Sequence, residues 1–520
     1  MSVVTLGDHA SKLTAEIHSI ASAAGLHIPE SHVDDFASLL GALDQSVKTI
    51  LDKNDYGPMP NLIKYPRMNI SITHGAVETD KGGWATKCIA QSIVPTNDLL
   101  KGRNIALKDN VALAGVRCTN GTAAMERTLE IDATVATRIM DAGGIITGKA
   151  ACENACLEGV SDISVTGKVH NPYADNYSAG GSSRGSGRLV PSGVVDLAIG
   201  FDQGGSIRIP SSNCGMVGLK PTWGLVPYTG IISLECTIDH VGPMSRNVPD
   251  VARLLQAIAG PDGIDDRQSA YLPPQTLEYT KQLYDFLSSM EGPSQSLTGV
   301  TVGMLVCEVA VLKLRDLGAE VRDVSVPSHS NAAMVWMCYL PITSGRPGLL
   351  SNMSGRKQLY MTDRVTKSGR KLTQESFDAR GPSAQNFYLR YLHLDEKYGS
   401  ELHAKFQDEY DRVLREVDVL VMPTLPSPPC KLLEDPASHG PIERLSRNVG
   451  LVGNNSPFNN TGHPALTIPV VFVPAHDDHS ISLPVGLQIL GNKFRDIDCV
   501  FSRRESFTPD RRNHALFNIQ

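Results

Sequence analysis

Apolar residues near the N-terminus recur at spacings of three and four, a period that predicts two amphipathic helices within residues 8–52. The first apolar stripe runs from Leu13 to Ala24, and the second runs from Val33 to Ile50. Glycine and proline become frequent between Asn54 and Pro66, where the second helix is expected to give way to an extended linker. The pattern therefore predicts a helical N-terminal segment and linker over residues 1–95.

The two predicted helices need a further surface to cover their apolar stripes, because a lone helical pair is only marginally stable. Two coverings remain open from the sequence: a second copy of the chain, or the domain that follows in the same chain. The first of these would make the protein a homodimer.

From residue 102 onward, short apolar runs alternate with stretches of helical period. Strands are expected at residues 104–108, 144–147, 194–201, 301–306, 321–326, 417–422, 465–470 and 485–490. Helices are expected between them, one capped by Asp132 and ended by Gly143, and another over residues 311–317. The run Val194–Phe201 carries only Asp196 as a polar residue, which suits a strand covered on both faces. The alternation predicts an α/β fold with a mixed, largely parallel central sheet covered by helices.

The composition narrows the class of protein. Of the 520 residues, 41% are hydrophobic and 20% are charged, which is ordinary for a globular chain with a buried core. Acidic residues outnumber basic ones, 55 to 48, and no basic stripe occurs, so a nucleic-acid partner is not expected. No apolar run reaches the length of a membrane span, and the N-terminus lacks the pattern of a signal peptide. The ten cysteines are therefore expected to be reduced thiols of a cytoplasmic protein.

Three features resemble known functional sites but lack the context that those sites need. Gly143–Ala150 nearly spells a phosphate-binding loop, yet no hydroxyl residue follows its lysine, and its isoleucines indicate a strand. Gly181–Gly185 matches a nucleophile elbow centred on Ser183, but no buried strand precedes it. Cys152 and Cys156 can share a helix face, but no further pair of ligands at matching spacing accompanies them, so no metal site is expected.

Two further loops carry more specific information. Residues 178–187 form a glycine–serine loop, and residues 202–213 directly follow the predicted buried strand. Small residues allow backbone N–H groups to turn inward and approach a ligand closely. Several N–H groups of the second loop can then face one oxygen as an oxyanion hole, with Ser206 as the attacking hydroxyl. The residues expected to form this hole are Gln203, Gly204, Gly205 and Ser206.

Taken together with other segments, the two loops resemble the motifs of the amidase signature family. The matching segments are Ile105–Asn110, Gly180–Ser183, Asp202–Pro210, Gly218–Thr222, Asp239–Pro243, Val421–Thr424, Asn460–Pro464 and Leu483–Gln488. They occur in the order that the family has. The resemblance implies the amidase signature fold for a catalytic domain over residues 96–495. It also implies an atypical C-terminal tail over residues 496–520, where the closing amphipathic helix of the family is not recognisable.

Members of this family use a Ser–cis-Ser–Lys triad, and the resemblance carries each role to one residue here. Ser206 is implied as the nucleophile, Ser182 as the bridging serine after a cis peptide, and Lys108 as the base. The implied reaction is hydrolysis of a small carboxylic amide through a seryl acyl-enzyme, without a cofactor or metal. Substrate contacts are implied for Ser182 and residues 203–206. Cys156 falls where some members contact the acyl part of the substrate, although a buried core thiol is an equally good interpretation.

The likeness is greatest to bacterial amidases that hydrolyse amides made from nitriles, which carry a similar helical N-terminal segment used for dimerisation. A homodimer is therefore expected. Two other functions stay open: an amidotransferase subunit that supplies ammonia to a partner, and a catalytically impaired relative. The segment at residues 1–95 argues against the first, and the complete triad argues against the second. One departure from the family pattern is Arg184, which stands where glycine is usual, and Gly187 and Pro191 weaken the helix expected next.

Overall fold

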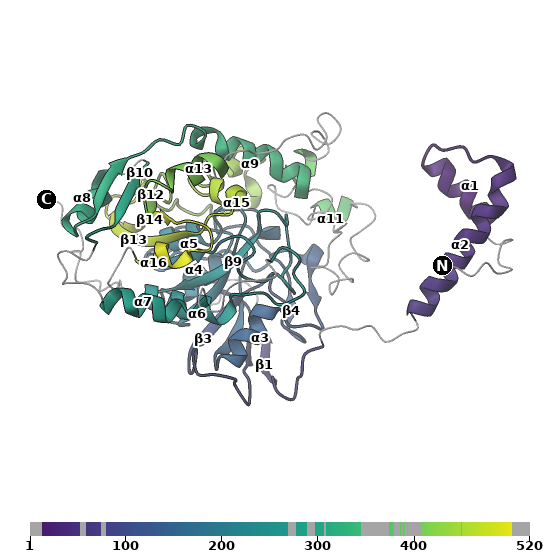
Figure 1. Cartoon of the computed structure of the whole chain (residues 1–520), viewed down its shortest axis with the longest axis horizontal. Helices are drawn as coiled ribbons and strands as arrows, with labels where there is room; N and C mark the ends of the chain where they lie inside the picture. Colours follow the sequence, from purple (N-terminus) through teal and green to yellow (C-terminus); the bar gives the residue numbers. More distant parts are fainter. Residues whose placement is uncertain are drawn as a thin grey trace. The chain divides into compact units, whose positions relative to one another are not determined.

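The computed structural model describes residues 13–51, 59–73, 80–268, 277–288, 297–305, 308–344, 374–378, 385–386, 388–390, 393, 407–448 and 450–501. Expectations for residues 1–12, 52–58, 74–79, 306–307 and 502–520 lie outside the described residues. The chain divides into two compact units, Met1–Pro58 and Met59–Gln520 (Figure 1). No helix in the described part of the chain is both long and apolar enough to cross a membrane.

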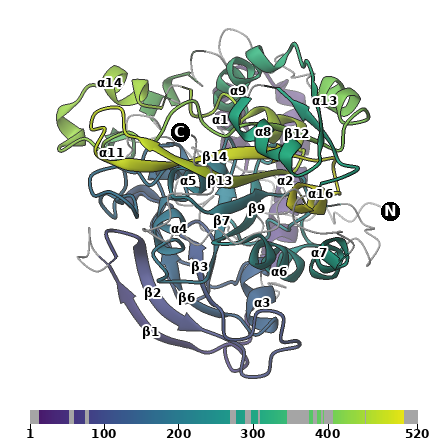
Figure 2. The ribbon, with the colours of Figure 1, turned by 90° about the vertical axis from the view of Figure 1, so that its left-hand side faces the viewer.

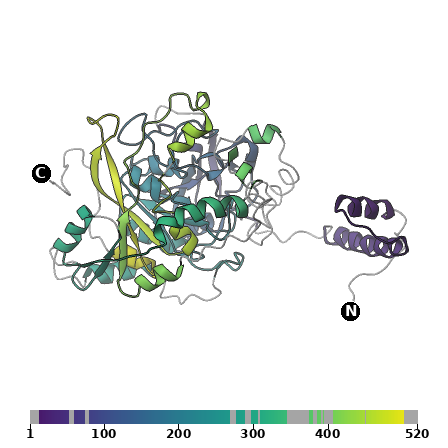
Figure 3. The ribbon, with the colours of Figure 1, turned by 90° about the horizontal axis from the view of Figure 1, so that it is seen from above.

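The first unit contains the two helices that the sequence predicts, α1 (Thr14–Ala23) and α2 (Glu30–Leu51). The helices lie side by side (Figure 3). Ile17 of α1 and Val33 and Ala37 of α2 are buried. Other apolar residues of α2 are exposed, namely Phe36, Leu39, Leu40, Leu43 and Val47. The contact with α1 therefore covers only part of the apolar surface of α2.

In the part of the chain that the structure describes, the second unit is built around one twelve-stranded sheet. In spatial order its strands are β1 (Arg67–Ile72), β2 (Trp84–Ala90), β6 (Ile145–Ala150), β3 (Asn104–Lys108), β7 (Leu197–Asp202), β9 (His240–Ser245), β8 (Val217–Lys220), β13 (Ala465–Pro474), β14 (Ser482–Leu490), β12 (Val419–Pro423), β10 (Thr301–Met304) and β11 (Glu320–Asp323). A small second sheet pairs β4 (Arg117–Cys118) with β5 (Arg127–Thr128). Figure 2 shows the strands β1 and β2 at one end of the large sheet and the long strands β13 and β14 across its middle.

The sheet is mixed, as predicted, but it is not largely parallel. Strand β3 lies parallel between β6 and β7, and β10 lies parallel between β12 and β11. The other neighbouring strands of this sheet pair antiparallel. Antiparallel neighbours need only a short return of the chain, as between β13 and β14, whereas parallel neighbours need a longer crossover. Apolar runs locate strands without encoding their direction, so the sequence pattern could not reveal this arrangement.

Helices cover both faces of the sheet. The helices described in the second unit are α3 (Thr134–Asp141), α4 (Arg184–Leu189), α5 (Arg208–Asn213), α6 (Val248–Ile258), α7 (Tyr279–Ser288), α8 (Glu308–Asp316), α9 (His329–Ser344), α11 (Gln374–Asp378), α13 (Gln407–Val413), α14 (Pro441–Ser446), α15 (Pro457–Thr461) and α16 (Asp496–Phe501), with short 3₁₀ turns η2 (Ala123–Met125), η3 (Asn154–Cys156) and η8 (Pro436–Ser438). Strand β3 is buried on both sides: Leu107 packs in one apolar cluster with Ile139 of α3, and Ala106 packs in another with Leu189 of α4. Because side chains alternate across a strand, these clusters lie on opposite faces of the sheet.

The boundary after the N-terminal segment falls at Pro58, not at residue 95. Residues 67–90 contain β1 and β2, which extend the sheet of the second unit through the pairing of β2 with β6. Ile70 and Ile72 of β1 are exposed, because this strand lies at the edge of the sheet. An edge strand without a buried face gives no hydrophobic pattern from which the sequence could place it in the core domain.

The start of the predicted atypical tail, residues 496–520, is a packed helix. Helix α16 contacts α7 and β13, and Asp496 and Cys499 within it are fully buried. The Asp496 carboxylate accepts hydrogen bonds from the N–H and the hydroxyl of Thr222, each at 2.6 Å. These two bonds tie the first turn of α16 to the chain just beyond β8.

Two local expectations for helices are also corrected. Asp132 does not cap α3, because the N-cap residue is Ala133 and the Asp132 carboxylate instead pairs with the Arg67 side chain. Helix α4 forms despite Gly187, and it ends two residues before Pro191. A proline beyond the last turn is compatible with a helix, since only a proline in the helix interior would remove a backbone hydrogen bond.

Candidate active site

The parallel strands β6, β3 and β7 end at the same edge of the sheet. In α/β sheets, ligands bind outside the carboxyl ends of parallel strands, where the following loops meet. Lys108 is the last residue of β3, residues 151–156 follow β6, and residues 203–206 follow β7. The topology therefore gathers the predicted site residues at one edge, although they are far apart in the sequence.

Lys108 and Ser182 are joined directly. The Lys108 Nζ donates a hydrogen bond to Ser182 Oγ at 2.7 Å, and both side chains are fully buried. The peptide bond between Gly181 and Ser182 is cis. The Lys108 Nζ also lies 5.0 Å from the ring centroid of Phe201 on β7. This geometry places the implied base against the implied bridging serine, with an aromatic ring as the neighbouring wall.

Ser206 lies on the segment next to Ser182. The Ser183 N–H donates to the Ser206 carbonyl at 3.3 Å, so the two serine-bearing segments are hydrogen-bonded neighbours. Ser206 keeps 8% of its surface exposed, whereas Ser183 is fully buried. The Ser183 hydroxyl donates to the Phe201 carbonyl at 3.3 Å and accepts from the Phe201 N–H at 3.2 Å. Ser183, the alternative nucleophile, therefore binds strand β7 instead of facing a substrate.

A buried ion pair shapes the loop that carries Ser206. Arg208 Nη2 lies 2.9 Å from Asp202 Oδ1, and both side chains are fully buried. The Asp202 carboxylate also accepts from the N–H groups of Gly205 and Ile207, at 2.7 and 3.1 Å. Burial alone would raise the pKa of Asp202, but the charge and hydrogen bonds of Arg208 outweigh burial and hold that pKa well below its usual range. The ionised carboxylate thus anchors the loop that folds around it.

The loop leaves the N–H groups of Gly204 and Ser206 available as oxyanion donors. Gly205 was also expected to donate, but its N–H is bound to Asp202 and is therefore removed from the predicted set. Within the described residues, the N–H groups of Gly204 and Ser206 donate to no protein group. Glycine is required at both positions: a Cβ at Gly204 would lie 2.6 Å from Cζ2 of Trp336, and Gly205 has a φ of +130°.

Gln203 is held at two points. Its side-chain Nε2 donates to the Cys156 carbonyl at 2.6 Å, and its own carbonyl accepts from Trp336 Nε1 at 2.7 Å. These two bonds engage the carboxamide and the carbonyl of Gln203, whereas the group expected in the oxyanion hole was its backbone N–H, which donates to no protein group within the described residues. Trp336 lies on α9, and no motif in the sequence pointed to it. The one available signal was rarity, because the chain has only three tryptophans.

The Cys156 thiol lies beside the implied base and bridging serine. Its Sγ donates to Asn120 Oδ1 at 3.1 Å. Burial would raise the pKa of Cys156, but a hydrogen bond from Cys152, the charge of Lys108 and hydrogen bonds with Ser182 and Lys108 lower it to about 7. The thiol thus adjoins the implied triad while it is also packed in the main apolar cluster, 3% exposed. Cys152 and Cys156 do not share one face of a regular helix, because Cys156 has a φ of +61°.

Arg184, which stands where the family motif usually has glycine, belongs to a buried ion pair with Glu153. Its Nη1 donates to Glu153 Oε1 at 2.8 Å, and its Nη2 donates to Thr166 Oγ1 at 2.9 Å. Burial raises the pKa of Glu153 well above its usual range, although the charge of Arg184 opposes that shift. The Glu153 N–H donates to the Ser182 carbonyl at 3.1 Å. The substituted arginine is thus built into the support of the bridging serine.

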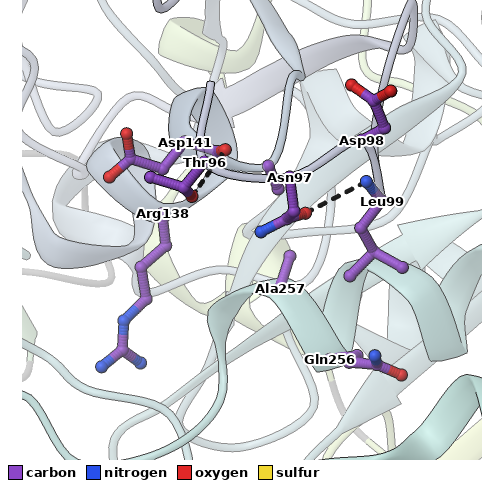
Figure 4. Close-up of a pocket in the computed structure, with 9 residues that line it drawn as sticks. Thr96, Asn97, Asp98, Leu99, Arg138, Asp141, Gln256 and Ala257 are labelled. Carbon is purple, nitrogen blue, oxygen red and sulfur yellow. Dashed lines mark hydrogen bonds between the residues drawn. The ribbon is translucent and has the colours of Figure 1, made fainter. Parts of the chain in front are cut away.

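A separate surface pocket lies at the opposite edge of the sheet, where residues 141–142 precede β6 (Figure 4). It is lined by Thr96, Asn97, Asp98, Leu99, Arg138, Asp141, Ala142, Gln256 and Ala257. Arg138 donates to the carbonyls of residues 258–261, and the Asn97 side chain accepts from the Leu99 N–H. These polar groups serve the local fold, so the pocket is not a second candidate for catalysis. Among the described residues, no cluster of side chains suits a metal ion.

Comparison with known proteins identifies relatives of this chain. A family model described as Amidase matches residues 85–500. The enantioselective amidase of Rhodococcus rhodochrous is 37% identical over 456 residues, which cover 81% of this chain and 80% of that protein. A glutamyl-tRNA(Gln) amidotransferase subunit from a Synechococcus species is 29% identical over 78% of this chain and 82% of that protein. The peptide amidase of Stenotrophomonas maltophilia has a TM-score of 0.58 and 25% identity over 79% of this chain and 83% of that chain.

The match of the family model extends over most of the chain, and its range includes Lys108 and the two serine-bearing segments. The solved relative shares the large mixed sheet with its covering helices. This chain therefore belongs to the amidase signature family.

Proposed function

We propose that the chain hydrolyses a linear carboxylic amide to a carboxylate and ammonia or an amine through a seryl acyl-enzyme. One observation carries the proposal: the buried Lys108 donates to Ser182 at 2.7 Å, and the segment of Ser182 is hydrogen-bonded to the segment of Ser206. This arrangement supports the proposed roles of Ser206 as nucleophile, Ser182 as proton relay and Lys108 as base. The related amidase of Rhodococcus rhodochrous supports an amide as the substrate class.

In the proposed reaction, the Lys108 side chain accepts a proton from Ser182 while Ser182 accepts one from Ser206. The Ser206 oxygen forms a bond to the amide carbon, and the carbonyl electrons move onto the carbonyl oxygen. The N–H groups of Gly204 and Ser206 stabilise that oxyanion. The proton returns through Ser182 to the amine, which leaves as the C–N bond breaks. Water then attacks the acyl-enzyme through the same relay and releases the carboxylate.

The proposal is tested with the purified full chain on aliphatic, aromatic and amino-acid amides, with release of ammonia as the readout. We expect Ser206→Ala to abolish both turnover and covalent labelling by a fluorophosphonate, because the variant lacks the attacking hydroxyl. Ser192→Ala, an exposed serine beyond α4, is the matched control and should leave both unchanged. Labelling that survives in Ser206→Ala would overturn the assignment of the nucleophile.

An amidotransferase subunit is the second candidate, because a relative of that name matches 78% of this chain. The two candidates differ in whether the lone chain is active. We expect ammonia release from simple amides without any partner. Activity that appears only with glutamine and a second protein would favour the amidotransferase subunit instead.

We further propose that the chain forms a homodimer through α1 and α2. The exposed apolar residues Phe36, Leu40, Leu43 and Val47 are spaced by three and four, so they share one face of α2. A contiguous exposed apolar face is typical of a protein–protein contact. We place the enzyme in the cytoplasm, since thiols in contact, such as those of Cys152 and Cys156, stay reduced there.

A further inference from the structure

Trp336 contacts the loop that supplies the oxyanion donors. Its side chain is buried, with 6% exposed, and its Nε1 donates to the Gln203 carbonyl at 2.7 Å. Its ring lies against Gly204, since a Cβ there would come within 2.6 Å of Cζ2 and 3.0 Å of Cε2. The tryptophan therefore combines a hydrogen bond and a ring contact on one peptide group.

The peptide between Gln203 and Gly204 is planar and trans, so its C=O and its N–H point in opposite directions. Trp336 holds the carbonyl on its own side. The Gly204 N–H consequently points to the other side of the peptide, away from the indole N–H. In the described part of the chain this N–H meets no acceptor, so it is free for an oxygen of the substrate.

The residues on either side of this peptide are fixed independently. The Gln203 side chain is bound to the Cys156 carbonyl, and the Gly205 N–H is bound to Asp202. Between these two anchors, Gly204 has no side chain to restrict rotation of its peptide planes. The hydrogen bond from Trp336 is therefore the contact that sets the orientation of the Gly204 N–H.

We propose that Trp336 is a positioning residue whose indole N–H orients the Gln203–Gly204 peptide, so that the Gly204 N–H stabilises the oxyanion formed at Ser206. The inference rests on the proposed seryl acyl-enzyme function. Donors that are oriented before the reaction stabilise the transition state without a cost of reorganisation. Loss of the indole N–H should therefore lower the rate of the chemical step and leave substrate binding largely unchanged.

Trp336→Phe tests this, because phenylalanine keeps an aromatic ring against Gly204 and lacks the N–H. Tyr339→Phe is the matched control: it removes one hydrogen bond from the same helix, between the Tyr339 hydroxyl and Thr237 Oγ1 at 3.1 Å. We expect kcat of Trp336→Phe to fall at least about tenfold. KM should stay within about twofold, because a contact realised in the transition state alone changes kcat and not binding. In Tyr339→Phe both constants should be unchanged.

Rates are expressed per active site, counted by titration with a fluorophosphonate, so that misfolded protein does not enter the result. The rate of phosphonylation itself should fall in Trp336→Phe, because the phosphonyl oxygen occupies the same hole. An unchanged kcat per site, or a rise in KM alone, would overturn the proposal and make Trp336 a packing or substrate-contact residue. If the native chain hydrolyses no amide, the proposed function fails, while the phosphonylation rates still decide the role of Trp336.

Discussion

Lys108 is fully buried and donates to Ser182. A substitution at this residue can therefore distinguish two roles for it, a catalytic base and a structural cation. Arginine retains the positive charge but cannot accept a proton, because its guanidinium stays protonated in proteins. We expect Lys108→Ala and Lys108→Arg to lower kcat by several orders of magnitude each, as for removal of one member of a coupled triad. The measurement is ammonia release from a simple amide, with the thermal midpoint as a check on folding. High activity in Lys108→Arg would show that charge alone is needed there.

Cys156 offers a test based on pH at the same site. Its pKa of about 7 means that the reactive thiolate increases as the pH rises through neutrality. We expect inactivation by iodoacetamide to accelerate about tenfold per pH unit below pH ~7 and to level off above pH ~8. A saturating amide should protect the enzyme, and Cys156→Ser should resist inactivation.

Cys430→Ser is the control for that experiment, because Cys430 is more exposed and burial raises the pKa of its thiol. Its removal should leave the profile unchanged. Inactivation that persists in Cys156→Ser, or that begins only in strongly alkaline solution, would place the reactive thiol elsewhere.

At the residue scale, the sequence predicts the site residues that lie in local motifs. It does not predict the site contacts that depend on the tertiary structure. Lys108, Ser182 and Ser206 lie in sequence motifs from which they could be predicted. The structure brings their segments together at one edge of the sheet. The engagement of the Gly205 N–H by Asp202 depends on a loop conformation that composition does not encode. The Trp336 contact with Gln203 joins residues 133 positions apart, so no window of sequence contains both partners.

At the scale of elements, strands with apolar runs were predicted and the others were missed. Strand β9 (His240–Ser245) is fully buried near the centre of the sheet, yet it contains Gly242 and Pro243, which normally argue against a central strand. Strand β1 has the opposite difficulty, because its apolar residues are exposed at an edge. In both cases pairing with neighbouring strands, and not the local sequence pattern, decides the structure.

Helix α16 permits a test of stability through Asp496. Burial raises the pKa of this carboxyl to about 6 from 3.8, although the hydrogen bonds from Thr222 oppose the shift. The folded state thus binds the proton more tightly, so the stabilising contribution is complete below pH ~3.8 and is lost as the pH rises through about 6. Asn stays neutral at every pH. We therefore expect the free energy of unfolding of Asp496→Asn to rise relative to that of the native chain by on the order of 2–3 kcal/mol as the pH increases from 4 to 7.5.

Urea unfolding at the two pH values measures this difference. Asp408→Asn on α13 removes the same charge from an exposed position. Its free energy of unfolding should match that of the native chain at both pH values. If the native chain and Asp496→Asn instead show parallel pH profiles, the carboxyl of Asp496 does not carry this linkage.

For the whole molecule, the apolar face of α2 predicts the oligomeric state. Phe36→Glu combined with Leu43→Glu introduces charge into that face without changing the second unit. We expect the native chain to have twice the monomer mass by light scattering and the double variant to be monomeric. Gln45→Glu with Thr49→Glu, at exposed polar positions of the same helix, should remain dimeric. A native chain with the monomer mass would contradict dimerisation through α2.

The sheet holds two parallel blocks, β6–β3–β7 and β12–β10–β11, on either side of its antiparallel middle. The proposed triad belongs to segments at the first block, while α9 follows β11 of the second and reaches the first through Trp336. For protein engineering, this separates the segments that carry the proposed triad from the segments around the second block. A library built on the second block affects the reacting groups only through contacts between the blocks, and position 336 is one of the contacts that should be left unchanged.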